Sequence, residues 1–371
     1  MMEHMEKDII KRIKCWQKSS EIFPVKLQYN PTNICNLNCV FCRDNSTSLL
    51  KKNRVRFLNW FDLKKELKLH HMIRIADEAV DMKVRHFFIG GGGEPFMRRE
   101  TLLLMKRVKS NGIYGDVITN GTLLTQETVK DIVEMHWDHV HFSIDGIGEV
   151  HNNLRQTKGA FERIIKAIKN IQHEKKNAKV DRPTLGFSMV LCTTNLLQVT
   201  KLMKFVANLG LDSFNVNPLK EYFRINKKLI LDKSHSKLLQ AELRKARDFA
   251  NKIGMETNLD SFIRDKKLTE SINEMSTIIK KRSKGKGILC YAPWYVLAID
   301  PYGNVGCCCE RIGENKENNV KKKSLKQIWE SSYFKTVRNN ILKYELSNAC
   351  ERCGTWQVDI MEGIRKELEK D

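Results

Sequence analysis

Three cysteines follow one another closely near the N-terminus in the pattern C-x3-C-x2-C, at Cys35, Cys39 and Cys42. Thiolates in such groups are typical ligands of iron–sulfur clusters. A four-iron cluster needs four ligands, and this motif supplies three, so one iron is left open for a small molecule. Structural zinc sites usually use four ligands with paired C-x2-C spacing, which makes zinc a weaker alternative here. The motif therefore predicts a four-iron cluster with one open coordination position.

A second group of cysteines lies in the C-terminal quarter of the chain. Its members could hold a second iron–sulfur cluster or a structural zinc ion, because disulfide frameworks are rare outside oxidising compartments. Two other cysteines, Cys15 and Cys192, stand alone and are interpreted as ordinary helix and strand residues. The members of the C-terminal group are Cys290, Cys307, Cys308, Cys309, Cys350 and Cys353.

The composition predicts a cytoplasmic protein without a membrane partner. The N-terminal residues carry charges throughout and lack the apolar region of a secretory signal, and no apolar stretch is long enough to span a membrane. The net charge of +21 would suit a nucleic acid or an acidic peptide. The lysines are scattered, however, and no nucleic-acid motif accompanies them, so we interpret the charge as solvated helix faces and expect no nucleic-acid partner.

Strand and helix patterns alternate regularly along the first part of the chain. Six such repeats indicate a parallel sheet covered by helices, and six are too few for a closed eight-fold barrel. We therefore predict an α/β fold with a partial (β/α)6 TIM-like barrel and a functional site at the carboxyl ends of its strands. The predicted strands are 25–29, 85–89, 115–119, 139–144, 185–191 and 212–217, and the predicted helices are 72–83, 101–110, 126–135 (capped by Thr125), 160–172 and one after 191.

The pattern changes beyond the sixth strand. Charged helices are expected up to residue 285, followed by a hairpin in which Tyr295–Ile299 turns at Pro301 and returns through Val305. We therefore predict a small C-terminal cluster-binding domain made of a β-hairpin and helices. The predicted division is an N-terminal extension (1–24), a barrel (25–220), a helical bridge (221–289) and the C-terminal domain (290–371).

Alternation along the fourth strand places polar side chains on one face and apolar ones on the other. A polar inner face is not needed for stability, since filled barrels favour branched apolar residues there. His141 on this face is either a satisfied interior histidine or a candidate catalytic group that contacts substrate or relays a proton. The polar set is His141, Ser143 and Asp145, and the apolar set is Val140, Phe142 and Ile144.

With Phe41 before its last cysteine, the first motif resembles the pattern of the radical S-adenosylmethionine (SAM) superfamily over roughly residues 25–220. The resemblance implies a SAM-binding [4Fe–4S] cluster and reductive cleavage of SAM to a 5′-deoxyadenosyl radical. It also implies the cofactor-binding residues: the GGEP loop for the SAM amino group, the fourth-strand end for the ribose, and an arginine after it for the carboxylate. On this chain these residues are Phe41, Gly92, Gly93, Glu94, Pro95, Asn120 (in a TNG motif), Ser143, Asp145 and Arg155.

The later cysteines resemble the SPASM/twitch extension of these enzymes, in which a Gly-x4-Cys hairpin supplies a cluster ligand; here Gly303 and Cys308 match it. Alternation puts Cys307 and Cys309 on the opposite side, as packing residues. The resemblance implies one auxiliary [4Fe–4S] cluster, with zinc on the same thiols as the alternative. Its four predicted ligands are Cys290, Cys308, Cys350 and Cys353.

Four thiolates leave no open iron, so the auxiliary cluster is expected to take an electron from the substrate. We expect oxidation of a small polar substrate, sugar-like or aminocyclitol-like, because the segment 1–24 is short for a peptide-recognition domain. Maturation of a ribosomally made peptide is the first alternative. A non-catalytic electron-transfer protein is the second, and the intact SAM-type motifs argue against it. A reductant such as flavodoxin or ferredoxin is the expected partner.

Overall fold

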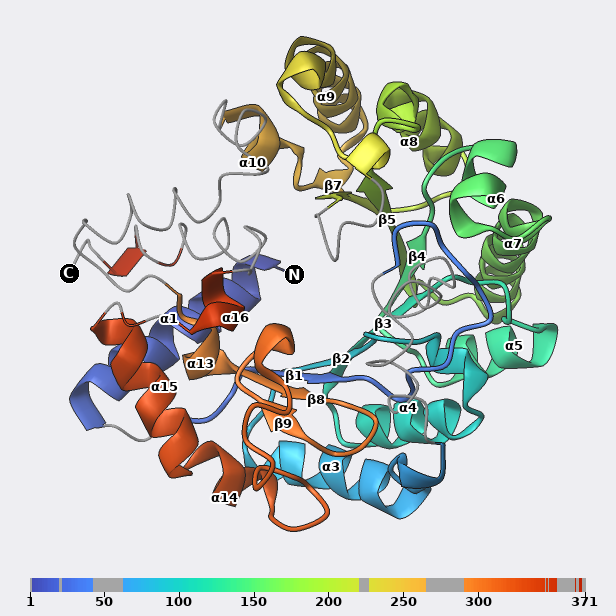
Figure 1. The fold of residues 1–371 in the computed structure, drawn as a ribbon. Helices are drawn as coiled ribbons and strands as arrows, with labels where there is room; N and C mark the ends of the chain where they lie inside the picture. The colour runs from blue at the N-terminus through green and yellow to red at the C-terminus, as the bar shows by residue number, and fades with distance from the viewer. Residues whose placement is uncertain are drawn as a thin grey trace.

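The fold was analysed in a computed structural model. It describes residues 2–19, 22–42, 63–219, 227–264, 290–343, 345, 347–351, 364 and 367–368. Figure 1 shows a curved sheet whose outer side is covered by helices, with the N- and C-terminal elements gathered beside one edge. The predicted α/β partial barrel is confirmed.

The six predicted strands form in the predicted order and pair in parallel with their sequence neighbours. Thr125 caps its helix as expected, because its hydroxyl accepts the backbone N–H of Thr128 at 3.2 Å. The strands are β1 (Lys26–Tyr29), β2 (His86–Ile89), β3 (Tyr114–Thr119), β4 (His139–Ser143), β5 (Thr184–Leu191) and β6 (Ser213–Pro218). The helices between them are α3 (Leu69–Asp81), α4 (Glu100–Ser110), α5 (Gln126–Glu134), α6 (Glu149–Arg155), α7 (Ala160–Ala178) and α8 (Val199–Ala207).

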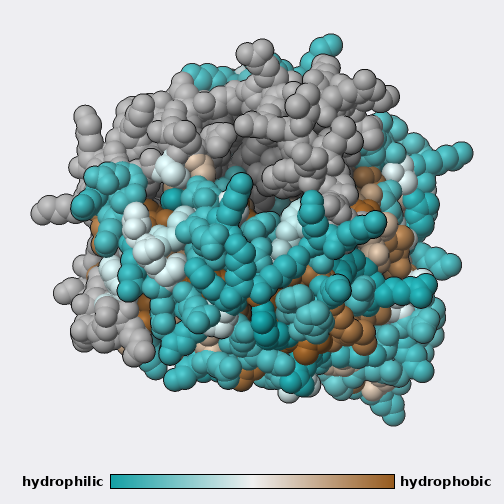
Figure 2. All heavy atoms as spheres, turned by 60° about the horizontal axis from the view of Figure 1, so that its bottom comes forward, coloured by the Kyte–Doolittle hydropathy of each residue, from teal (hydrophilic) through white to brown (hydrophobic). Residues whose placement is uncertain are grey.

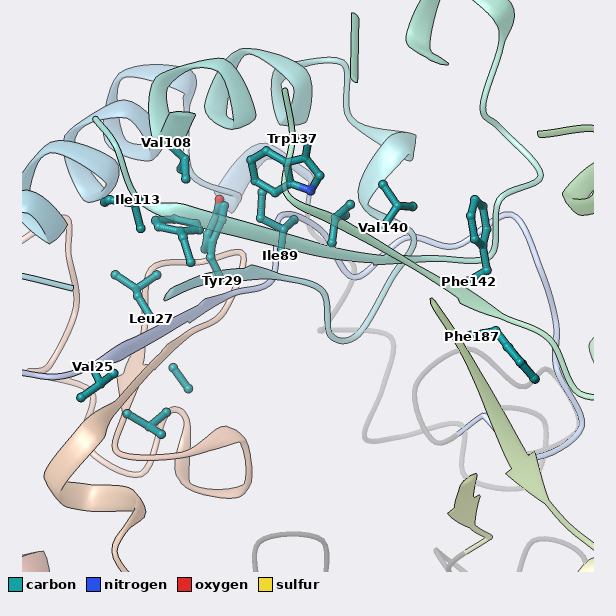
Figure 3. Close-up of a cluster of buried hydrophobic side chains, with 14 of the residues drawn as sticks. Val25, Leu27, Tyr29, Ile89, Val108, Ile113, Trp137, Val140, Phe142 and Phe187 are labelled. Atoms are coloured by element: carbon teal, nitrogen blue, oxygen red, sulfur yellow. The ribbon is translucent and has the colours of Figure 1, made fainter. Parts of the chain in front are cut away.

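The core lies between the outer face of the sheet and these helices. Figure 3 shows Val140 and Phe142 of β4 pointing to the same side as Trp137, near Val108 of α4. Each fully buried side chain of this size contributes about 1.5–3 kcal/mol relative to an exposed one. The outer face is therefore apolar, and the polar side chains of the same strands are left on the inner face.

Three short strands extend the sheet beyond the six that were predicted. β7 (Glu256–Thr257) pairs with β6, inside the segment predicted as a helical bridge, after α9 (Ser236–Ile253) and before α10 (Leu259–Arg264). At the other edge, β8 (Val296–Ile299) pairs in parallel with β1, and β9 (Val305–Gly306) pairs antiparallel with β8. The predicted hairpin is present, but its first strand belongs to the barrel sheet.

The N-terminal helix α1 (Met2–Ser19) packs against α13 (Ala292–Tyr295), which directly precedes β8. The Trp16 and Trp294 rings meet edge to face with centroids 5.1 Å apart. Figure 1 shows α1 beside α13 and α15. The remaining C-terminal helices are α14 (Leu325–Trp329), α15 (Ser332–Leu342) and α16 (Asn348–Glu351). The two ends of the chain are thus joined into one body next to β1 and β8.

Figure 2 shows one face of the molecule, where hydrophilic side chains cover most of the described surface and hydrophobic ones appear in scattered groups. Among the helices that the structure describes, none combines the length and apolar character needed to cross a bilayer.

Candidate active site and auxiliary cysteines

The cysteine loop begins where β1 ends. Cys39 is buried, while Cys35 and Cys42 are half-buried. The backbone N–H of Cys42 donates to the carbonyl of Cys39 at 3.1 Å, which closes a turn between the two cysteines. The Cys35 sulfur accepts weak hydrogen bonds from the backbone N–H of Leu37 at 3.5 Å and from the Asn120 amide at 3.9 Å. Cys35 therefore points at the end of β3, two strands along the sheet.

Burial keeps two of these thiols protonated in the absence of a metal. Burial raises the pKa of Cys35 to about 11. Burial also raises the pKa of Cys39, although the positive charge of Arg155 lowers it in part. Such thiols lose their protons when a metal binds them. No group of three His, Cys, Asp or Glu within the described ranges converges on one metal ion. A four-iron cluster binds each thiolate through a different iron and needs no such convergence, so the donor set fits the cluster.

The glycine loop after β2 lies directly against the cysteine loop. A Cβ atom on Gly93 would stand 2.2 Å from the Ile34 carbonyl oxygen, and one on Gly92 would stand 2.4 Å from Asn33 Oδ1. The backbone N–H of Glu94 donates to the same Ile34 carbonyl at 2.9 Å. Glycine is required here because two backbones meet with no room for a side chain. The loop thereby sets the position of the chain just before Cys35.

Glu94 is buried where the glycine loop ends, just before Pro95. Its carboxylate accepts hydrogen bonds from the Thr119 hydroxyl at 2.6 Å, the Asn120 backbone N–H at 2.8 Å and the Phe96 backbone N–H at 3.3 Å. Burial nevertheless raises its pKa to about 7. A cation beside this carboxylate would stabilise its charged form. The site is therefore suited to an ammonium group.

Asp145 and Arg155 form a buried ion pair that the sequence analysis did not foresee. Arg155 Nε donates to Asp145 Oδ2 at 2.5 Å, and Arg155 also donates to the Cys39 sulfur at 3.6 Å. Its guanidinium stands 5.5 Å from the centroid of the Phe41 ring. The other Asp145 oxygen accepts the Val190 backbone N–H at 2.8 Å. Asp145 therefore orients Arg155 toward the cysteine loop, while Ser143 is half-buried at the end of β4.

His141 lies on the inner face of the sheet, in the middle of β4. It is hydrogen-bonded to His139 at 3.3 Å and to Ser188 at 2.6 Å. Burial lowers its pKa to about 4, so it is a neutral imidazole at neutral pH. The structure places it on the same strand as Ser143, and no bond links it to the cysteine loop in the described residues.

The predicted auxiliary ligands come from three different elements. Cys290 precedes α13, Cys308 follows β9, and Cys350 lies in α16; Cys353 lies outside the described residues. Cys290 and Cys308 pack half-buried against the core. The pKa of Cys308 is raised well above its usual value by its hydrogen bond to Cys307 and by burial, with a further contribution from Cys350. Cys308 and Cys350 therefore share one electrostatic environment.

The three adjacent cysteines differ in exposure. Cys307 is fully buried, as expected for a packing residue, Cys308 is half-buried and Cys309 is exposed. The expected packing role of Cys309 is wrong, because β9 ends at Gly306 and a 3₁₀ turn begins at Cys309. The alternation of a strand does not extend over these positions.

Two family models match the chain. The one described as the radical SAM superfamily covers residues 29–206, and the SPASM one, described as an iron–sulfur cluster-binding domain, covers residues 290–354. The tungsten-containing aldehyde ferredoxin oxidoreductase cofactor-modifying protein of Pyrococcus furiosus is 26% identical over 51% of this chain and 49% of its own length. A PqqA peptide cyclase of Methylocella silvestris is 32% identical over 38% of this chain and 34% of its own. The chain spans half or less of the length of these curated relatives.

Solved structures share the fold. SuiB of Streptococcus suis has a TM-score of 0.63 at 18% identity, and the match covers 89% of this chain and 71% of that protein. A structure titled native anSMEcpe with bound AdoMet has a TM-score of 0.60 at 17% identity, with coverage of 91% and 89%. At these identities the likeness concerns the fold.

Proposed function

The chain belongs to the radical SAM superfamily and carries a C-terminal SPASM iron–sulfur domain, and we propose that Cys35, Cys39 and Cys42 hold its SAM-cleaving [4Fe–4S] cluster. When bound, cluster and SAM supply a 5′-deoxyadenosyl radical that abstracts hydrogen from the substrate. The observation that carries the assignment is that two segments contact the cysteine loop. The backbone N–H of Glu94, in the loop after β2, donates to Ile34 just before Cys35, and the Arg155 side chain of α6 donates to the Cys39 sulfur.

The chain's own residues would divide the binding of SAM among them. Glu94 offers its carboxylate to the amino group, and the glycines before it let the backbone approach closely. Arg155 offers a fixed positive charge to the carboxylate, and Asp145 keeps that charge in place. Ser143, at the end of β4, and Asn120 would bind the ribose. The Asn120 amide nitrogen also donates to Asn36. Asp145 acts through Arg155 in this arrangement.

We assign one auxiliary [4Fe–4S] cluster to Cys290, Cys308, Cys350 and Cys353. All four would be thiolates, so SAM and substrate have no open iron there, and the cluster would be suited to accept an electron from the substrate radical. Arg311 donates to the Cys350 sulfur at 3.7 Å and would stabilise negative charge on it. A structural zinc ion on the same thiols is the competing assignment. A flavodoxin or ferredoxin would supply the electron that starts the reaction.

For the substrate, we propose oxidation of a small polar molecule of sugar or aminocyclitol type. The support is the inner face of the sheet, which carries imidazole, carboxylate and hydroxyl groups at His141, Asp116 and Ser188. A peptide is the second candidate. It is favoured by the similarity to PqqA peptide cyclases, whose name states a peptide substrate, and by the net charge of +21, which suits an acidic leader.

The test is deuterium transfer into 5′-deoxyadenosine. Reconstituted protein receives SAM, a strong reductant and either the small-molecule or the peptide fraction of cells grown in heavy water. Deuterated 5′-deoxyadenosine with the small-molecule fraction supports the first substrate class, and with the peptide fraction the second. Failure to form any 5′-deoxyadenosine under reductant would contradict the proposed function itself.

A further inference from the structure

A cluster of titratable side chains on the inner face, which includes His141 and Asp116, has no role in binding SAM or the clusters. It consists of residues from four neighbouring strands, and Lys26 pairs in register with His86 while Asp116 pairs with His139. His86, His139 and His141 are only 7–8% exposed. Burying so many ionisable groups together is costly unless they serve one another or a ligand. The members are Lys26 (β1), His86 (β2), Asp116 (β3), and His139 and His141 (β4).

Hydrogen bonds join the two β4 histidines to β5 in one continuous chain. Ser188 Oγ lies 2.6 Å from His141 Nε2, and His141 Nδ1 lies 3.3 Å from His139 Nε2. His139 Nδ1 lies 2.8 Å from the Thr184 hydroxyl, which itself donates to the Asp138 carbonyl at 3.1 Å. The chain thus runs from Ser188 in the middle of β5 to the beginning of β4 and β5.

One arrangement of protons satisfies every link. Because Thr184 donates its hydroxyl hydrogen to a carbonyl, it must accept from His139 Nδ1–H. His139 Nε2 is then an acceptor for His141 Nδ1–H, and His141 Nε2 is left to accept from Ser188. Both imidazoles are neutral in this arrangement. His141 Nε2 is therefore a base that receives protons through the Ser188 hydroxyl.

The absence of a side chain at Gly186 allows this chain of hydrogen bonds to form. A Cβ atom there would stand 2.9 Å from His139 Nε2 and 3.0 Å from His141 Nδ1, and 2.3 Å from the Ser213 hydroxyl. The backbone of β5 therefore lies directly against the contact between the two imidazoles. A side chain at this position would separate the rings or force β6 away.

Among the groups around His141, Asp116 favours a proton on it, although burial lowers the pKa of His141 to about 4 overall. Burial also opposes ionisation of Asp116, but its neighbour His86 is the largest cause that lowers the Asp116 pKa, to about 2, so it is a carboxylate at neutral pH. Its Oδ2 stands 3.6 Å from His86 Nε2, and its Oδ1 has no hydrogen-bond partner in the described structure. Lys26 is the competing cation, and burial lowers its pKa. Tyr114, with its pKa raised by burial, stays neutral.

Ser188, at one end of this chain of hydrogen bonds, lies beside the proposed SAM site. Ser188 pairs in register with Ser143, the residue assigned to the SAM ribose. A substrate held against SAM would therefore be next to the Ser188 hydroxyl, whereas the imidazoles lie one step further along the strands.

We propose that Ser188, His141 and His139 accept the proton that the substrate releases when its radical is oxidised, with Asp116 as the counter-charge. This inference rests on the proposed function and narrows its substrate to a molecule with an O–H or N–H on the carbon that loses hydrogen. The radical on that carbon would form C=O or C=N by losing one proton and one electron, for which the auxiliary cluster held by the four cysteines would be the acceptor. The proton goes to Ser188 Oγ while the Ser188 hydroxyl proton passes to His141 Nε2.

Proton placement can be measured without any substrate. In the cluster-loaded full chain with isotope-labelled histidine, NMR should find His139 and His141 both protonated on Nδ1 and bare on Nε2 at neutral pH. Acidification should add one proton shared by the pair, and Asp116→Asn should move this uptake to lower pH. Asp131→Asn, which removes a surface carboxylate paired with Lys106, is the control and should change nothing. A proton on His141 Nε2 at neutral pH, or no effect of Asp116→Asn, overturns the proposal.

The role in turnover is tested with the substrate fraction that transfers deuterium. Ser188→Ala, His141→Asn and Gly186→Ala should still form deuterated 5′-deoxyadenosine, because hydrogen abstraction precedes proton loss. Oxidised product per 5′-deoxyadenosine should fall about 10²-fold or more, the usual contribution of a general base. The exposed His136→Asn is the control and should keep the normal ratio. An unchanged ratio in His141→Asn overturns the proposal. Absence of 5′-deoxyadenosine in the unmodified protein would instead count against the proposed function, and the NMR measurement would still decide the proton arrangement.

Discussion

The two cysteine regions are built in different ways. The first lies where parallel strands end at one edge of the sheet, so Glu94, Asn120 and Asp145, which follow three successive strands, all reach the cysteine loop or its neighbours. In the second, Cys290 precedes a four-residue helix, Cys308 follows a two-residue strand, and Cys350 lies in another four-residue helix. In the first region the ends of neighbouring strands hold the residues in place, whereas in the second the cysteines lie on or beside short separate elements.

This difference indicates how each region should respond to change. Parallel strands in one sheet place their carboxyl ends together whether or not a ligand is present. A site on short elements depends more on the metal, because binding energy of the metal contributes directly to folding there. We expect substitutions in the first region to abolish chemistry while leaving the protein folded, and substitutions in the second to alter cluster content and local stability.

The largest effect is expected for Cys39→Ala. It removes one thiolate from a site with three and no spare ligand, so 5′-deoxyadenosine formation from SAM under strong reductant should fall to the level without protein. Cys192→Ala, at a buried cysteine outside both groups, is the matched control and should keep the activity. Retained cleavage in Cys39→Ala would refute the assignment of the catalytic cluster, and far-ultraviolet circular dichroism should show an unchanged fold.

The next largest effect is expected on the iron content, which distinguishes the second cysteine region from the first. The unmodified protein should hold about eight irons, and Cys308→Ser should reduce this to about four. Cys307→Ser and Cys309→Ser should keep all of it, because Cys307 is buried in the core and Cys309 is exposed in a turn. Spectroscopy of these variants with Cys35, Cys39 and Cys42 replaced by alanine isolates the second cluster. Four irons and one zinc in the unmodified protein would instead support zinc.

Gly93→Ala tests whether the glycine loop after β2 sets the position of the cysteine loop in the first region. The added Cβ would collide with the backbone oxygens of Ile34 and Thr32, at 2.2 and 2.6 Å, and would displace the chain before Cys35. Overpacking of this kind costs about 1–3 kcal/mol in unfolding free energy. We expect at least a tenfold loss of SAM affinity, measured by calorimetry. Gly112→Ala is the control: its φ of +70° adds strain, but no atom lies near its Cβ, so SAM affinity should be kept.

The last prediction concerns pH, whose effect is spread gradually over more than two pH units. Burial raises the pKa of Glu94 to about 7 from an unfolded value of 4.5, so the native state holds a proton that the unfolded state has lost between these values. Stability of the SAM-free protein should therefore fall as pH rises through that window, by about 3 kcal/mol at most. Glu94→Gln should remove this slope in urea unfolding. SAM affinity should rise as pH rises through about 7 in the unmodified protein and stay flat in Glu94→Gln; equal slopes would exclude Glu94 as the ammonium partner.

Local patterns in the sequence were sufficient for the first six strands, for the Thr125 cap and for the fold class, and these predictions are confirmed. The reason is that strand alternation, helical stripes and caps depend on residues close together in the chain. The motifs at Cys35–Cys42 and at Gly92–Pro95 are equally local. Their predicted roles as cofactor-binding residues stay predictions, and so does the ligand role of Cys353, which lies outside the described residues.

Only the tertiary structure decided the pairings between distant residues. β8 lies beside β1 although more than half of the chain separates them, and no local pattern shows which edge a late strand will join. The Asp145–Arg155 pair and the His139–His141–Ser188 chain arise because the register of β4 and β5 and the position of α6 bring these side chains together. Such contacts depend on packing free energy summed over the whole sheet, whereas the sequence pattern reports only what each segment prefers by itself.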